Sequence, residues 1–317
     1  MKIVYITGCL GFIGRYVTQL LLENGFYVYG IDSCTYATDM SVLENFISND
    51  KFKFEKKNIL DIDRLVDCDF FINIAAETHV DNSIRDSKVF LNSNIVGVYN
   101  ILEHLKIYKK EGYNVPRLIH FSTDEVYGDI ADGEHIETDT LRPSNPYSAT
   151  KAAADQLIIA WARTYDIPYN IIRPTNNYGI GQYVEKLIPK TCKFLGLDRK
   201  IPLHNLGTPI RNWLHAKDTA SAVLKIIESG TSNEIYNVAG GFEQSNIDTV
   251  RKVINCYHET ENLDHNLFID FRYERPGQDV RYALNDDKLR ALGWKPNCIF
   301  DNEIADIVKY YKNKFVW

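Results

Sequence analysis

Long apolar runs and clusters of basic residues are both missing from this sequence. No apolar stretch approaches the roughly 20 residues that a membrane-spanning helix needs. Basic residues occur at most as short pairs, such as Lys56-Lys57 and Lys109-Lys110, and the net charge is -6. We therefore expect neither a membrane nor a nucleic acid as a partner.

Cysteine is sparse and unclustered. The six cysteines form no C-x-x-C pair and have no histidines at metal-ligand spacing. His79, His120 and His215 also lack a second ligand at suitable spacing, so we expect structural histidines and no metal. The first residues, KIVYIT, have the character of a strand and not of a signal peptide. Reduced thiols and a cytoplasmic location follow as expectations.

What the chain does contain is an alternation of short apolar runs and helical patterns. Near-continuous apolarity is typical of parallel strands that are covered on both faces. The sequence therefore predicts an α/β fold, a Rossmann-type doubly wound parallel sheet with a smaller C-terminal substrate-binding domain. The expected strands are Lys2–Thr7, Tyr27–Asp32, Phe52–Lys57, Phe70–Ala75, Arg117–Ser122, Asn170–Pro174 and Glu234–Val238.

Three long helices are expected, over Lys88–Tyr108, Tyr147–Tyr165 and Lys217–Glu228. Beyond Pro174 the pattern becomes irregular and rich in loops. We expect residues 1–175 to form the first domain, with 210–238 returning to it. Residues 176–209 and 239–317 would then form the smaller domain, facing the carboxyl edge of the sheet.

A glycine-rich segment, TGCLGFIG, follows the first strand and opens a helix. Its glycines, Gly8, Gly11 and Gly14, allow a tight turn, close backbone approach to a pyrophosphate, and helix packing. Asp32 ends the second strand, where a carboxylate can accept hydrogen bonds from ribose hydroxyls and repel a 2′-phosphate. The pattern favours NAD over NADP, although Arg15 could meet a 2′-phosphate and Asp32 could merely cap the next loop.

Tyr147 and Lys151 stand four residues apart at the start of a helix, so that both side chains share one face. An ammonium close to a phenol favours the phenolate and lowers the phenol pKa from its usual value near ~10. The pair is suited to removing a proton from an alcohol while hydride leaves for a nicotinamide. A surface tyrosine beside a solvated lysine is the simpler alternative.

Two adjacent acids, Asp124 and Glu125, follow the expected strand that ends at Ser122. In a dry pocket each carboxylate disfavours ionisation of the other, which leaves one charged and one neutral. Such a pair can divide the work of base and acid. The alternative is a solvated loop that carries two surface acids.

Taken in order, several segments resemble the extended short-chain dehydrogenase/reductases, and more narrowly the nucleotide-diphosphate-glucose 4,6-dehydratases. The segments are TGCLGFIG, AAETHVDNSI, STDEVYGD, NPYSATKA, NNYGIGQYVEKLIPK, RNWLHAKDTA and ERPGQDVRYALNDDKLRALGW. The tyrosine-lysine motif resembles the whole superfamily. The triplet Thr123-Asp124-Glu125 resembles the dehydratases and not the sister epimerases and decarboxylases.

The resemblance implies a mechanism. Tyr147, helped by Thr123, would take the proton of the sugar 4-hydroxyl while hydride passes to NAD. Glu125 would then remove the C5 proton, and Asp124 would protonate the departing C6 hydroxyl. Return of hydride from NADH to C6 and of a proton to C5 would leave a 4-keto-6-deoxy sugar.

The resemblance also implies the other site residues. Those expected to contact NAD are Gly8, Gly11, Phe12, Ile13, Gly14, Asp32, Asn58, Ile59, Ala75, Ala76, Tyr147 and Lys151. Those expected to bind the nucleotide sugar are Thr78, Asn176, Asn177, Lys186, Arg211, Asn237, Arg275 and Gln278, with Asp81 near the sugar.

Departures from the family pattern leave the base open between uracil and thymine. Gln278 stands where the bacterial deoxythymidine-diphosphate enzymes usually have histidine, and Asn82 stands where they usually have arginine. An epimerase or decarboxylase of the same superfamily, or an NAD-sensing protein without catalysis, remains an alternative. Surplus apolar residues on the helices 88–108 and 147–165 predict a homodimer.

Overall fold

The computed structural model describes residues 2–314. Residues 1 and 315–317 of the expected domains lie outside this part of the chain. The fold is α/β, with a seven-stranded parallel sheet in the order β3-β2-β1-β4-β5-β6-β10. Its strands are β1 (Ile3–Thr7), β2 (Tyr27–Asp32), β3 (Phe52–Lys56), β4 (Phe70–Asn73), β5 (Arg117–Phe121), β6 (Tyr169–Pro174) and β10 (Glu234–Val238). All seven expected strands are confirmed, with ends that shift by at most two residues.

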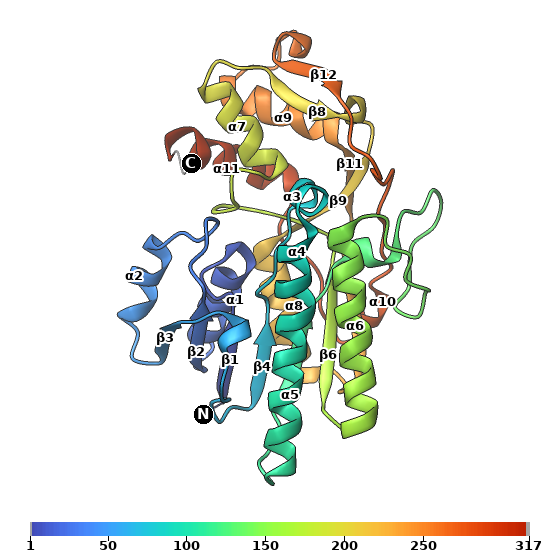
Figure 1. Ribbon diagram of the computed structural model, residues 1–317. Coiled ribbons are helices and arrows are strands. Elements are labelled where there is room, and N and C mark those ends of the chain that lie inside the picture. The colour runs from blue at the N-terminus through green and yellow to red at the C-terminus, as the bar shows by residue number, and fades with distance from the viewer. Residues whose placement is uncertain (1, 315–317) are drawn as a thin grey trace.

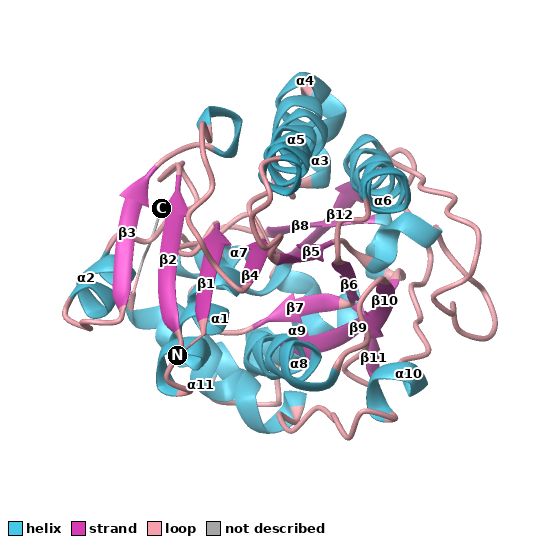
Figure 2. Ribbon diagram, turned by 90° about the horizontal axis from the view of Figure 1, so that it is seen from below, coloured by secondary structure: helices cyan, strands magenta, loops and turns pink. Residues whose placement is uncertain are grey.

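Helices cover both faces of this sheet (Figure 2). On one face lie α1 (Phe12–Glu23) and α8 (Ala216–Ser229), with α2 (Ser41–Ile47) beside β3. On the other face lie α5 (Gly97–Lys110) and α6 (Pro146–Tyr165). Strand residues alternate between the two layers, as period two requires: Val4 and Ile6 pack on the α1 side, and Tyr5 on the α5 side.

The expected helix over Lys88–Tyr108 is not one regular helix. It divides into α4 (Ser87–Phe90), a π-helix η2 (Leu91–Val96) and α5. Within η2, the buried Asn94 side chain accepts from the Glu77 amide and donates to the Glu77 carbonyl oxygen and to Thr150 Oγ1. Through these hydrogen bonds, Asn94 connects the loop after β4 to α6. The apolar pattern of the sequence does not reveal the wider π-helical turn.

A smaller second part lies over the carboxyl ends of the strands (Figure 1). It contains a three-stranded sheet of β7 (Asn176–Tyr178), β9 (Ile210–His215) and β11 (Phe242–Ser245) and a parallel pair of β8 (Ile201–His204) and β12 (Ile269–Tyr273). Its helices are α7 (Leu187–Gly196), α9 (Asn246–His258) and α11 (Phe300–Asn313). Although 210–238 was expected to return to the first part, only α8 and β10 do so, because β9 pairs with β7 and β11.

The remaining helical pieces are short. They are α3 (Val80–Arg85), α10 (Asp287–Arg290) and the 3-10 turns Ile59–Asp61, Asp124–Tyr127, Asn205–Gly207 and His265–Leu267. Across residues 2–314, no helix has both the length and the apolar character needed to cross a membrane.

Candidate active site

The glycine loop after β1 has the shape of a dinucleotide-binding turn. Gly8 adopts a φ of +69°, and a Cβ there would lie 2.9 Å from the Ala75 amide nitrogen. A Cβ on Gly14 would lie 1.9 Å from the Gly8 carbonyl oxygen. Gly11 is the N-cap of α1, whose first turn opens at the carboxyl edge of the sheet. The chain can take this path only with glycine at the two crowded positions, as the predicted phosphate cradle requires.

Asp32 fastens this loop from the end of β2. One carboxylate oxygen accepts the Leu10 amide at 3.1 Å, and the other accepts the Cys34 amide at 2.8 Å and the Thr38 hydroxyl at 3.3 Å. The capping role left open by the sequence is therefore present, and contact with a ribose remains a prediction. Arg15 is paired with Asp39 at 3.6 Å.

The other predicted cofactor residues follow strand ends nearby. Asn58 caps the turn Ile59–Asp61 by accepting the Leu60 amide, and Ile59 is buried. Ala75 and Ala76 follow β4, and the Ala75 amide donates to Thr7 Oγ1. The buried Thr7 hydroxyl in turn donates to Asn73 at 2.6 Å. These contacts hold the backbone, and the cofactor roles of the residues remain predictions.

Asp124 begins the 3-10 turn after β5 and is 3% exposed. Thr123 caps the turn: its hydroxyl donates to Asp124 Oδ1 at 3.0 Å and accepts the Glu125 amide at 3.3 Å. Asp124 Oδ2 has no hydrogen-bond partner among residues 2–314. Burial, followed by the charge of Glu125, raises the pKa of Asp124 to about 7. A large share of this carboxyl group therefore keeps its proton at neutral pH, as a general acid must.

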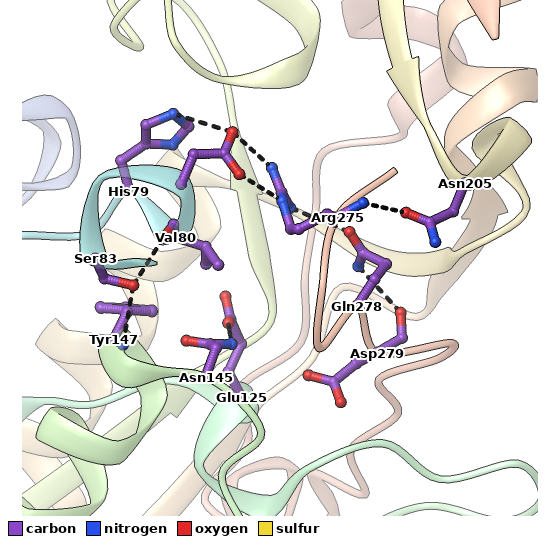
Figure 3. Close-up of polar contacts among 11 residues, drawn as sticks. His79, Val80, Ser83, Glu125, Asn145, Tyr147, Asn205, Arg275, Gln278 and Asp279 are labelled. Carbon is purple, nitrogen blue, oxygen red and sulfur yellow. Dashed lines mark hydrogen bonds and ion pairs between the residues drawn. The ribbon is translucent and has the colours of Figure 1, made fainter. Parts of the chain in front are cut away.

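Glu125 lines the cavity beside Asp124. Its Oε2 accepts a hydrogen bond from Asn145 Nδ2 at 3.2 Å, and both residues line the cavity (Figure 3). Burial raises the pKa of Glu125, whereas the Asn145 hydrogen bond and then the charge of Arg211 oppose that rise. The two acids thus have different surroundings, and the cationic and amide groups favour charge on Glu125.

Tyr147 opens α6, which Asn145 caps by accepting the Ser148 amide. Its backbone amide donates to Ser83 Oγ at 3.2 Å. Burial and then the charge of Glu125 raise the pKa of the Tyr147 phenol, which the hydrogen bond with Thr123 opposes. This direction is opposite to the expected lowering by a nearby ammonium, because burial outweighs the other influences on the phenol.

Lys151 explains the difference. Its ammonium is buried and donates to the Phe121 carbonyl oxygen. Burial lowers the pKa of Lys151 to about 8, and the charge of Asp155 opposes the fall. Asp155 itself is fully buried and paired with Arg173 at 3.0 Å. The ammonium thus has other partners, and burial dominates the titration of the phenol.

A cavity lies between the two parts of the protein, with Glu125 in its wall. Seven of the predicted substrate residues line it: Thr78, Asn176, Asn177, Lys186, Arg211, Arg275 and Gln278. Lys186 donates to the Thr78 carbonyl oxygen at 3.0 Å, and the Arg211 guanidinium lies 4.5 Å from the centre of the Tyr282 ring. Four cationic side chains line this cavity: Lys186, Lys190, Arg211 and Arg275. This composition suits an anionic ligand such as a diphosphate.

Asn237 does not reach this cavity, so its prediction as a substrate contact is wrong for this structure. The residue is fully buried within β10. Its amide accepts from the Tyr127 hydroxyl at 2.8 Å and donates to the His135 and Asn285 carbonyl oxygens, both at 3.1 Å. Every polar atom of the side chain is engaged in joining three segments, which is a structural role.

Sequence reasoning missed several cavity residues. The signal for Asn145 was present, because Asn before Pro and Tyr, with Ser three positions later, is a helix start. His79 was expected to be structural, and it lines the cavity 3.6 Å from Asp81. No local pattern marks the others, which are Val80, Gln182, Glu185, Leu187, Lys190, Pro202, Leu203, His204, Trp213, Asn246, Gly277, Asp279 and Tyr282.

The buried histidines and the acids form no metal centre in the described part of the chain. Within residues 2–314, no three His, Cys, Asp or Glu side chains come together as ligands. His120 is fully buried against Asn73, and His215 caps α8 by accepting the Lys217 amide.

The doubly wound sheet, the glycine loop and the Tyr147–Lys151 helix define an extended short-chain dehydrogenase/reductase. More narrowly, the chain belongs to the family described as GDP-mannose 4,6 dehydratase, whose sequence profile matches residues 5–307. It is 36% identical to the low-salt glycan biosynthesis protein Agl12 of Haloferax volcanii, over 97% of this chain and 98% of that protein.

Two further relatives carry the name of one enzyme. The dTDP-glucose 4,6-dehydratase of Haemophilus influenzae is 35% identical, over 98% of both chains. The solved structure of DesIV, the dTDP-glucose 4,6-dehydratase of Streptomyces venezuelae, contains NAD. The two structures superpose with a TM-score of 0.90, and their sequences are 32% identical. The match covers 98% of this chain and 97% of the DesIV chain.

Proposed function

We propose that this protein is an NAD-dependent nucleotide-sugar 4,6-dehydratase, a hydro-lyase that acts on dTDP-glucose or UDP-glucose. The observation that carries the proposal is the acid pair. Asp124 has its pKa raised to about 7 and lies beside Glu125, which is in contact with an amide and opens on a cation-rich cavity. An elimination of water needs one neutral and one charged group in such an arrangement.

The residues divide the reaction as follows. Tyr147, with Thr123 beside it, accepts the proton of the sugar 4-hydroxyl. Glu125 removes the proton on C5, which becomes acidic once C4 is a ketone. Asp124 gives its proton to the departing C6 hydroxyl, and water leaves. When hydride has returned to C6, C5 takes back a proton, which gives the 4-keto-6-deoxy sugar. Lys151 contributes a buried ammonium below the tyrosine.

The glycine loop fits the pyrophosphate of a dinucleotide, because side chains at Gly8 and Gly14 would collide with backbone. Bound NAD would supply the hydride acceptor for C4 and the hydride donor for C6, and its positive ring would lower the phenol pKa that burial raises. We also infer a division of labour, with the seven-stranded part holding NAD and the second part holding the nucleotide.

Two relatives act, by their names, on dTDP-glucose, which favours thymine as the base. The test is to incubate the purified protein with dTDP-glucose and with UDP-glucose, first without and then with added NAD, and to weigh the products. Loss of one water supports the proposal, and the faster nucleotide identifies the base. A new product of unchanged mass that separates from the starting nucleotide by chromatography would instead indicate the epimerase alternative. Unchanged nucleotides with NAD still bound would indicate an NAD-sensing protein.

We further propose that the protein is a homodimer through the helices 88–108 and 147–165. Large apolar side chains of these helices are exposed to solvent in the single subunit. They are Val89, Leu91, Val96, Tyr99, Ile107 and Tyr165. Exposed apolar side chains that gather in a patch mark a surface that binds another protein. Figure 2 shows α5 and α6 adjacent on the same outer layer.

Light scattering tests the assembly. Val96→Glu should convert a dimer to a monomer, because the interface would have to bury a charge. Leu267→Glu is the matched control, since Leu267 is also exposed and lies on the 3-10 turn of the second part. A wild-type monomer, or a Val96→Glu dimer, would contradict this interface. The six free thiols favour a reducing compartment, so we place the dimer in the cytoplasm.

A further inference from the structure

An ion pair spans the cavity between the two parts of the protein. Arg275, in the segment after β12, reaches α3 of the first part, where Asp81 accepts two hydrogen bonds. Nε donates to Oδ1 at 2.6 Å and Nη2 donates to Oδ2 at 3.0 Å. This is the bidentate geometry that planar guanidinium and carboxylate groups favour. Figure 3 shows Arg275 crossing toward the helix that carries Val80 and Ser83.

Arg275 is held on its other sides as well. Its Nη1 donates to Gln278 Oε1 at 3.1 Å, and its backbone amide donates to Asn205 Oδ1 at 3.1 Å. A guanidinium has five N–H donors, so two remain, one on each terminal nitrogen. Both arginine and Gln278 line the cavity. The side chain is therefore fixed in direction while part of its donor capacity is unused.

The charge of Asp81 is balanced mainly by Arg275, and less by His79, which lies two residues before it in sequence. Burial, and then the charge of Lys186, lowers the pKa of His79 to about 4, so that this imidazole is neutral at neutral pH. Burial alone would raise the pKa of Asp81, but the hydrogen bonds and charge of Arg275 outweigh it and hold the pKa below its usual value. Asp81 is thus a charged anchor for one arginine.

The helix that carries Asp81 also touches the catalytic helix. Ser83, two residues on, accepts the Tyr147 amide at 3.2 Å and donates to the Val80 carbonyl oxygen at 2.7 Å. A single short helix thus connects the arginine on one side of the cavity with the start of α6 on the other.

We propose that Asp81 is a positioning residue, which holds Arg275 with its two unused N–H groups toward the diphosphate of the nucleotide sugar. The inference rests on the proposed function and adds to it the residue that orients the phosphate-binding arginine. Prior fixation favours binding, because a free arginine loses rotamer entropy when it meets a phosphate and a fixed one does not. Asp81 takes one edge of the guanidinium and leaves the other, so it need not compete with the ligand.

The experiment measures the affinity of NAD-loaded protein for dTDP, UDP and the corresponding nucleosides by calorimetry, in wild type and Asp81→Asn. We expect about a tenfold loss of affinity for the diphosphate in the variant, on the order of one charge-assisted hydrogen bond, and a much smaller loss for the nucleoside. In turnover, KM should rise by more than kcat falls. Equal affinity, or tighter diphosphate binding by Asp81→Asn, would overturn the proposal.

Two controls separate positioning from simple bracing. The double variant Asp81→Arg with Arg275→Asp restores a tie between the two parts, so it should regain thermal stability but not diphosphate affinity. Recovery of both would show a brace and refute the proposal. Glu243→Gln removes a bidentate pair of the same kind with Arg281, at 2.8 Å and away from the cavity, and should leave affinity unchanged. If wild type binds neither dTDP nor UDP, the proposed function fails, and not the role of Asp81 alone.

Discussion

Replacing Asp124 by asparagine should stabilise the protein above pH 7 and leave its stability unchanged below about pH 4. The carboxyl group is 3% exposed, and its pKa rises from an ordinary 3.8 to about 7 in the folded state. Each pH unit between these values costs about 1.4 kcal/mol, so full ionisation costs the fold roughly 4 kcal/mol. Asparagine carries no charge, and its oxygen can still accept the Thr123 hydroxyl.

The sign follows from which state binds the proton more tightly. Below pH 3.8 both folded and unfolded chains are protonated, and the acid costs nothing. Between 3.8 and about 7 the unfolded chain loses its proton first, so wild-type stability falls as pH rises. Above about 7 the penalty is complete and constant. The difference between Asp124→Asn and wild type should therefore grow across this window and then level off.

The assay is urea unfolding of both proteins at several pH values between about 4 and about 8.5, with saturating NAD throughout. The exposed Asp132, changed to asparagine, is the control and should run parallel to wild type. Parallel curves for Asp124→Asn and wild type would refute the reasoning, as would a variant that is less stable than wild type at pH 8. Either result would mean that the acid is not held protonated by its surroundings.

Three further predictions concern turnover. Glu125→Gln should slow product formation by about 10²–10⁴-fold. Bound NADH should accumulate after substrate is added, and its absorbance measures it, because oxidation at C4 precedes the blocked step. Rapid product formation would show that Glu125 is not the base. Tyr147→Phe should show no NADH at all, and its prompt appearance would count against the phenol. Asn145→Ser keeps the helix cap but loses the hydrogen bond that lowers the Glu125 pKa. The pKa of Glu125 should therefore rise, and the acidic limb of the plot of kcat against pH should move to higher pH. An unchanged acidic limb would contradict this prediction.

The sheet could be predicted because local sequence determines its strands. Apolar runs gave the seven strands, and the residues just past β1 and β5 had to meet at one edge of a parallel sheet. The resemblance to the dehydratases supplied Thr123, Asp124 and Glu125, and their catalytic roles remain predictions. The titration of Tyr147 could not be predicted, because its burial depends on how segments remote in sequence pack around the phenol.

The misses share a cause, which is that they depend on contacts between distant segments. Asn237 has the right residue type for a ligand contact, but its amide meets three segments that only the fold brings near. Arg275 and Asp81 are remote in sequence, so no spacing rule pairs them. The π-helix η2 breaks a pattern whose apolar period looks regular.

The path of the chain has a consequence for how such proteins diversify. The second part is not a separate module: it is built from two excursions, one between β6 and α8 and one after β10, and the β8–β12 pair stitches them together. Neither excursion can be exchanged alone without breaking the β8–β12 pairing. An exchange of the whole second part between relatives would therefore need both excursions to be replaced together. Loops inside each excursion can nevertheless lengthen or shorten without touching the main sheet. Substrate preference can therefore change through short insertions or deletions in these loops, while the main sheet and the residues at its carboxyl edge stay the same.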